Sequence, residues 1–292
     1  MELHGIYDKG FVLLKSWLGQ AVVTMFIFYS GYGVYESIKL KGKEYISAFP
    51  RRRILITLVN YALAILIFLC ADLMLGKVPK ATNILLAFTG WTSIGNSNWY
   101  IFAMLCLYII TWLSFIVFSK NHAAALCSVT LLSLVYVILM QRFKPSEGWW
   151  YNTFFCYAMG MWYSFCKESI EEFLRRGGHY FLALFSVSFC VLLLRPFTKH
   201  LIIYETWSLL FTAMVVLITM KVSIHSRLLY WCGKHTFELY ILQRLPMMIL
   251  HNFHIDQYPY VFLLLTLACI FPMVYLFSKL LHMVDNKILS VT

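Results

Sequence analysis

Residues 54–75 read ILITLVNYALAILIFLCADLML, an apolar run whose only residue charged at neutral pH, Asp72, stands near its end. A helix needs about 20 consecutive apolar residues to cross the hydrocarbon core of a bilayer. This run is long enough, and several others in the chain resemble it. We therefore expect a transmembrane helix here and a membrane fold around it.

Composition extends this expectation to the whole chain of 292 residues. It is 61% hydrophobic and 13% charged, with a mean hydropathy of +0.73, whereas soluble domains are about one quarter charged. The aromatic content of 18% fits the enrichment of Trp and Tyr at membrane interfaces. The eight cysteines form no C-x-x-C pair, so the sequence offers neither a zinc ribbon nor a redox motif.

The predicted fold is an all-α, polytopic bundle of about nine transmembrane spans forming one domain over residues 1–292. Gly and Pro residues mark several of the predicted ends, as they do at helix termini. The predicted spans are 17–37, 54–75, 98–118, 122–140, 150–166, 179–195, 201–220, 228–250 and 258–282.

Lys and Arg placement predicts the orientation, because cytoplasmic loops carry the excess of basic residues. The densest basic cluster runs from Lys39 to Arg53, which places the end of the first span and the C-terminus in the cytoplasm. The same arrangement puts the N-terminus outside, where no signal-peptide pattern explains it. We therefore expect a further span before Met1.

Three segments carry a family resemblance. Residues 26–61 read FIFYSGYGVYESIKLKGKEYISAFPRRRILITLVNY, residues 98–102 read NWYIF, and residues 233–242 read GKHTFELYIL. In order and spacing they resemble the membrane acyltransferase-3 family of polytopic O-acyltransferases. Three departures are evident: the family's first helix with its catalytic His is not seen, Gln243 stands where a His ends the late segment, and Ile56 replaces the second Arg of an R-x-x-R pattern.

The resemblance implies transfer of an acyl group, most simply acetyl, from cytoplasmic acyl-CoA to a hydroxyl of a surface carbohydrate or its lipid-linked precursor. It also implies that the protein lies in the inner membrane of a bacterium. Arg51, Arg52 and Arg53 suit the donor, because guanidinium groups bind phosphate bidentately. As an alternative, three adjacent basic residues serve as a topology signal or anchor lipid headgroups. No permanently bound cofactor and no nucleic-acid partner is expected, since the basic residues lie in short loops.

The catalytic base is not identified by the sequence. Glu238 and His4 are the weak candidates, Glu238 because ionisable groups within spans are costly and therefore suggestive. For Glu238 and Gln243 a structural polar network is the favoured alternative to a substrate site. For Trp99 and Tyr100, anchoring at the membrane interface and stacking on a sugar are equally good explanations. His251 and His254 have the H-x-x-H spacing of metal ligands, and Asp256 is close by, but we interpret them as solvated residues at the membrane interface. We therefore expect no metal site. Possible substrate contacts are Asn98, Trp99, Tyr100, Tyr240 and Gln243.

Two other functions stay open. One is a non-enzymatic membrane protein, such as a transporter or flippase of lipid-linked sugars, which a polar track along one intramembrane face and interrupted helices would favour. The other is an inactive, N-terminally truncated acyltransferase.

Overall fold

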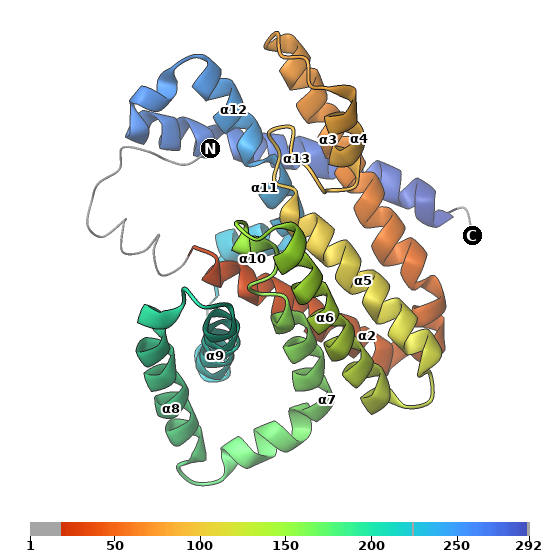
Figure 1. The fold of residues 1–292 in the computed structure, drawn as a ribbon, viewed down its shortest axis with the longest axis vertical. Helices are drawn as coiled ribbons and strands as arrows, with labels where there is room; N and C mark the ends of the chain where they lie inside the picture. The colour runs from red at the N-terminus through yellow and green to blue at the C-terminus, as the bar shows by residue number, and fades with distance from the viewer. Residues whose placement is uncertain (1–18, 224, 291–292) are drawn as a thin grey trace. The chain divides into compact units, whose positions relative to one another are not determined.

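The computed structural model describes residues 19–223 and 225–290, and these residues are almost entirely helical, with no strand among them (Figure 1). Short 3₁₀ turns at Gly148–Trp150, Arg195–Phe197 and Ile255–Gln257 link some helices. The helices are α2 (Ala21–Phe49), a π-helical turn (Pro50–Leu55), α3 (Ile56–Met74), α4 (Ala81–Phe88), α5 (Trp99–Val117), α6 (His122–Phe143), α7 (Phe155–Arg175), α8 (His179–Leu194), α9 (Leu201–Thr219), α10 (Arg227–Lys234), α11 (Thr236–Leu242), α12 (Arg244–Asn252) and α13 (Pro259–Ser290).

Six helical segments of the described chain are long and apolar enough to cross a membrane. Large apolar side chains remain exposed along them, for instance Phe185 on α8 and Leu264 on α13, as expected of surfaces that face lipid. The predicted helical membrane architecture is thus supported, whereas the predicted number of nine spans is not confirmed. The six segments are Ala21–Met74, Trp99–Val117, His122–Phe143, His179–Phe197, Leu201–Thr219 and Pro259–Ser290.

The first of these segments is not a single straight helix. Gly42 breaks α2 with φ 52° and ψ −129°, a conformation that glycine tolerates because it has no Cβ atom. The Lys-rich stretch after residue 37, predicted as a short connection, is instead helical on both sides of this break. It then runs through the π-helical turn that holds Arg51, Arg52 and Arg53 into α3.

The prediction of one continuous span over residues 228–250 is wrong. The chain here forms α10, α11 and α12. The helix is interrupted at His235, with φ −108° and ψ 27°, whereas Gln243 between α11 and α12 keeps helical backbone angles. Pro246 lies in the first turn of α12, where its missing N–H leaves no intrahelical hydrogen bond unmade. The predicted span 150–166 is also displaced, because its helix, α7, begins at Phe155 and continues to Arg175 through charged residues.

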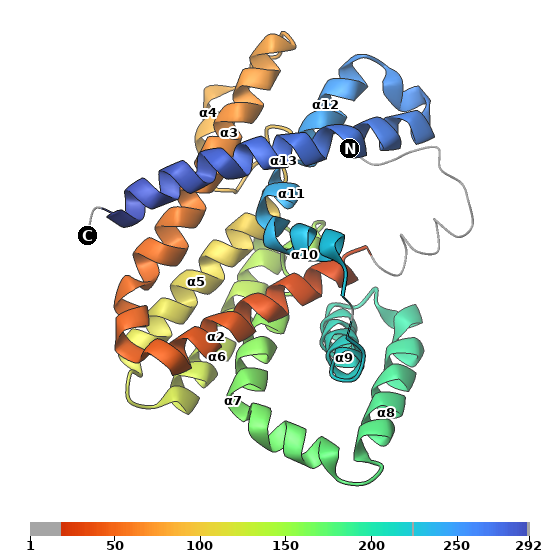
Figure 2. The same ribbon diagram turned by 180° about the vertical axis from the view of Figure 1, so that it is seen from behind.

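The described residues divide into two compact units. Unit 1 comprises residues 51–105 and 225–290, and unit 2 comprises residues 19–50 and 106–223. In unit 1, α11 and α12 pack on α3 and α13 (Figure 2), around a core that includes Tyr61, Phe68, Ile241, Leu245 and Val274. In unit 2, the most extensive helix contact joins α2 and α7, and α8 packs beside α9.

The contact of α2 with α7 depends on a glycine in each helix. A Cβ atom on Gly31 would clash with the carbonyl oxygen of Tyr157, and one on Gly160 would clash with the carbonyl oxygen of Phe28. Small residues let helix backbones approach this closely within membranes. Beyond the crossing, the Ser164 hydroxyl donates to Glu36 Oε1 at 2.7 Å, which extends the contact with a polar pair.

Candidate functional site

A histidine–carboxylate pair lies at the break between α10 and α11. His235 Nδ1 is 3.4 Å from Glu238 Oε1, and the two side chains are only 14% and 12% exposed. The Trp231 ring lies 4.7 Å from the His235 ring and limits its movement. Because Nδ1 faces the carboxylate, Nε2 is the nitrogen that remains to exchange a proton with another group.

Two further polar residues extend this pair into a cluster of unit 1. Asn60 Nδ2 of α3 donates to Asp285 Oδ2 of α13 at 3.3 Å, and Glu238 and His282 lie within electrostatic range of Asp285. The other oxygens, Asn60 Oδ1 and Asp285 Oδ1, are buried without a hydrogen-bond partner in the described chain. Such buried acceptors are unfavourable unless a donor reaches them, so this cluster is suited to receive protons or a polar ligand. We call Asn60, His235, Glu238 and Asp285 the polar cluster.

The three arginines belong to the same unit as the polar cluster. The Arg51 guanidinium donates to the carbonyl oxygen of Ile288 near the end of α13, Arg52 is exposed, and Arg53 is partly exposed. Arg51 is therefore engaged with the protein backbone. Arg52 is the arginine that presents its side chain most fully to a ligand.

Of the five predicted substrate contacts, Tyr100 and Tyr240 come together. Their ring centroids are 5.1 Å apart, and the Tyr100 N–H donates to Tyr240 Oη at 3.4 Å. Trp99 packs edge-on against Tyr100, and Asn98 Nδ2 donates to the carbonyl oxygen of Gly90 at 2.8 Å. Gln243 is exposed between α11 and α12. Asn98 thus has a local structural role, and the tyrosine pair holds α5 to α11.

Tyr61 lies within electrostatic range of Tyr240 and makes a polar contact of its own. Asn96, which is fully buried, donates from Nδ2 to Tyr61 Oη at 2.9 Å. Tyr61→Phe should destabilise the protein by about 1–3 kcal/mol, because the Asn96 amide would keep only a weaker contact with the Ser97 carbonyl. Thermal unfolding in detergent measures this. Tyr258→Phe, at an exposed tyrosine of the same unit, is the control and should leave stability unchanged.

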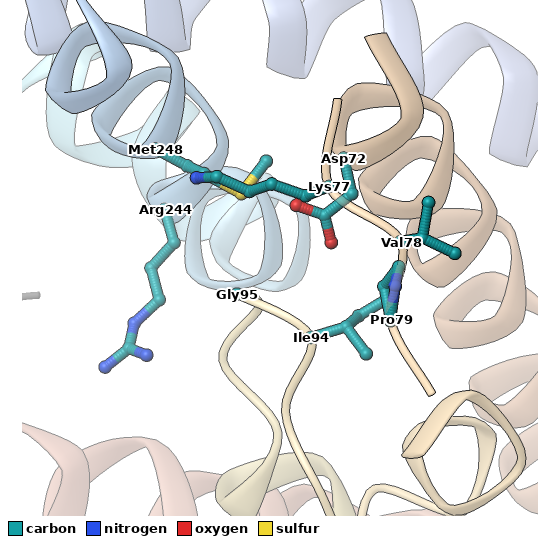
Figure 3. A pocket seen from close by; sticks show the side chains of 8 residues that line it. All are labelled: Asp72, Lys77, Val78, Pro79, Ile94, Gly95, Arg244 and Met248. Carbon is teal, nitrogen blue, oxygen red and sulfur yellow. The ribbon is translucent and has the colours of Figure 1, made fainter. Parts of the chain in front are cut away.

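A cavity of about 400 Å³ opens between the end of α3 and α12 in unit 1 (Figure 3). Three charged side chains line it: Asp72, Lys77 and Arg244. Asp72 is only 6% exposed although its carboxylate is directed toward this space. The rest of the lining is apolar or backbone, from Val78, Pro79, Ile94, Gly95 and Met248.

The remaining candidates lie elsewhere. His251 Nδ1 is 2.7 Å from Asp256 Oδ2 and exposed, and His254 adopts a left-handed conformation with φ 56°. No group of three metal-ligating side chains occurs within residues 19–290 as far as they are described. Glu205 is buried in α9, and neither of its carboxylate oxygens has a hydrogen-bond partner there. His4 lies outside the described residues.

Sequence reasoning missed three members of the polar cluster. Asn60 stands inside the most apolar predicted span, and an amide within such a run is a detectable signal. Asp285 follows the predicted end of the last span at residue 282, but α13 continues to Ser290 and carries it into the cluster. His235 was part of the quoted late segment, yet the predicted continuous helix concealed its position at a break.

No family model, no curated protein and no solved structure matches this chain.

Proposed function

We propose that the protein is a bacterial inner-membrane O-acyltransferase. It transfers an acyl group, most simply acetyl, from acyl-CoA to a hydroxyl of a surface carbohydrate or its lipid-linked precursor. The observation that carries the proposal is the His235–Glu238 pair, which lies in the segment that resembles the acyltransferase-3 family. The exposed Arg52 belongs to the same unit.

The chemistry assigned to the pair is general-base catalysis. His235 accepts the proton of the acceptor hydroxyl, and the hydroxyl oxygen forms an ester bond with the acyl carbonyl carbon. The thioester C–S bond breaks, and the CoA thiolate takes the proton from His235. Glu238 orients the imidazole and stabilises its protonated form, as the carboxylate does in other His–carboxylate pairs. The positive-inside pattern places the C-terminus and the arginines on the cytoplasmic side, where acyl-CoA is supplied.

Replacing Arg51, Arg52 and Arg53 together by Gln should abolish acetyl-CoA binding to the purified protein. Arg52→Gln alone should weaken binding by about tenfold to a hundredfold, the effect of losing one charge-assisted phosphate contact. Titration calorimetry with acetyl-CoA measures both. Arg175→Gln/Arg176→Gln, two exposed arginines in unit 2, is the matched control and should bind normally. Unchanged binding in the triple variant would refute the donor assignment.

The interrupted helix favours a second candidate function, transport of lipid-linked sugars. The interruption at His235 lies within a stretch otherwise long enough to span, and transporters use interrupted helices to hold substrates or ions. Purified protein in vesicles separates the two functions. An acyltransferase transfers radiolabel from acetyl-CoA to a glycan acceptor, whereas a flippase moves a labelled lipid-linked sugar across the bilayer without acetyl-CoA.

A further inference from the structure

The cavity between α3 and α12 gathers charges that lack partners. In the described chain, Asp72, Lys77 and Arg244 form no ion pair with one another or with other residues. Lys77 acts on Asp72 only through space, and Arg244 acts in the same way on Tyr240. Asp72 as a residue is only 6% exposed, and its unpaired carboxylate faces the cavity, where it can accept hydrogen bonds from a ligand.

The lining specifies the chemistry of such a ligand. Arg244 and Lys77 supply two positive charges for an anionic group, and the planar fork of the Arg244 guanidinium can donate to two phosphate oxygens at once. Asp72, when ionised, only accepts hydrogen bonds and therefore selects hydroxyl or amine donors. Val78, Pro79, Ile94 and Met248 provide apolar surface against which the C–H face of a sugar ring can pack. The cavity volume of about 400 Å³ is within the range of small-ligand sites.

We propose that this cavity binds a hydroxylated phosphate, with its phosphate on Arg244 and Lys77 and a hydroxyl on Asp72. As part of the acceptor site, this assignment rests on the proposed acyltransferase function and narrows the acceptor to a phosphate-bearing glycan. The cavity would hold the end of that glycan remote from the reacting hydroxyl, because Asp72 and Asn60 of the polar cluster are about 18 Å apart along α3. The binding itself requires neither acyl-CoA nor the polar cluster. A sugar phosphate and a lipid headgroup such as that of phosphatidylglycerol share this chemistry.

The test is titration of the full-length protein in zwitterionic nanodiscs with glucose 1-phosphate, inorganic phosphate and glucose. Glucose 1-phosphate should bind best. Arg244→Gln should weaken its binding by about tenfold to a hundredfold, and Asp72→Asn should abolish the preference over inorganic phosphate. Lys80→Gln, an exposed lysine beside the cavity that does not line it, should bind like the wild type. Size-exclusion chromatography and thermal unfolding confirm that each variant is folded.

Two results would overturn the site: wild-type binding in both Arg244→Gln and Asp72→Asn, or an equal loss in Lys80→Gln, which would indicate general electrostatic attraction. The titration is repeated in nanodiscs that contain phosphatidylglycerol, to distinguish a sugar phosphate from a lipid headgroup as the ligand. If this lipid competes with glucose 1-phosphate, the cavity is a headgroup site. If it does not compete, the cavity is a sugar-phosphate site. Acetyl-CoA titration is run in parallel. If the protein bound glucose 1-phosphate but not acetyl-CoA, the proposed ligand site would be supported and the proposed acyltransferase function would be refuted.

Discussion

His235→Asn is expected to lower the rate of acetyl transfer by about 10²–10⁴-fold, the usual contribution of a positioned general base. Asparagine keeps the approximate size and polarity of the side chain but cannot take the hydroxyl proton. Glu238→Gln should lower kcat less severely and leave KM for acetyl-CoA unchanged, because this carboxylate positions the imidazole and does not hold the donor. Both variants should still bind acetyl-CoA, which shows that they are folded.

The protein contains a matched control for this experiment. His251 also pairs through Nδ1 with a carboxylate, Asp256, and belongs to the same unit, but it is about half exposed and lies apart from the polar cluster in sequence. His251→Asn should therefore keep wild-type activity. If His235→Asn kept full activity, or if His251→Asn lost as much activity as His235→Asn, His235 would not be the general base. Transport would then be the better explanation of the interrupted helix.

The sequence predicts those parts of the fold that depend on local apolar runs. The predicted span 54–75 corresponds to α3 at Ile56–Met74, and 201–220 corresponds to α9 at Leu201–Thr219. The segment 228–250 is similar in length but much less apolar, because it carries the charged residues Lys234, Glu238 and Arg244, and its helix is interrupted at His235. These three charged side chains distinguish the segment from 54–75 and 201–220, which carry one each, so the sequence did contain a signal against one continuous apolar span.

The candidate site was less predictable, since it depends on contacts between residues distant in sequence. Glu238, Tyr240 and Tyr100 were chosen from the sequence, but only the structure brings the two tyrosines together and places Asp285 within electrostatic range of Glu238. Asn60 and Asp285 are separated by more than 200 positions, and no local pattern pairs them. Local sequence thus identified both tyrosines of one contact and neither residue of the Asn60–Asp285 hydrogen bond, and tertiary packing determined which residues meet.

The second large effect is expected at the crossing of α2 and α7, where Gly31→Ala and Gly160→Ala should each destabilise unit 2. Each added Cβ meets a backbone carbonyl of the opposite helix, which cannot move aside as a side chain can. Overpacking of this kind costs about 1–3 kcal/mol and sometimes more, so the melting temperature in detergent should fall clearly. Gly31→Val, with its branched side chain, should prevent the two helices from packing.

Gly33→Ala is the internal control, because it lies on the same helix with no atom near its added Cβ. Alanine favours helix over glycine by about 1 kcal/mol, so this variant should be neutral or slightly stabilised. The double variant Gly31→Ala/Gly160→Ala should lose less stability than the two single losses combined. The first substitution already separates the helices, and residues that share one contact are not additive. If the stability losses of the two single variants were strictly additive in the double variant, or if Gly33→Ala lost as much stability as Gly31→Ala, the close approach of the two backbones would not determine this crossing.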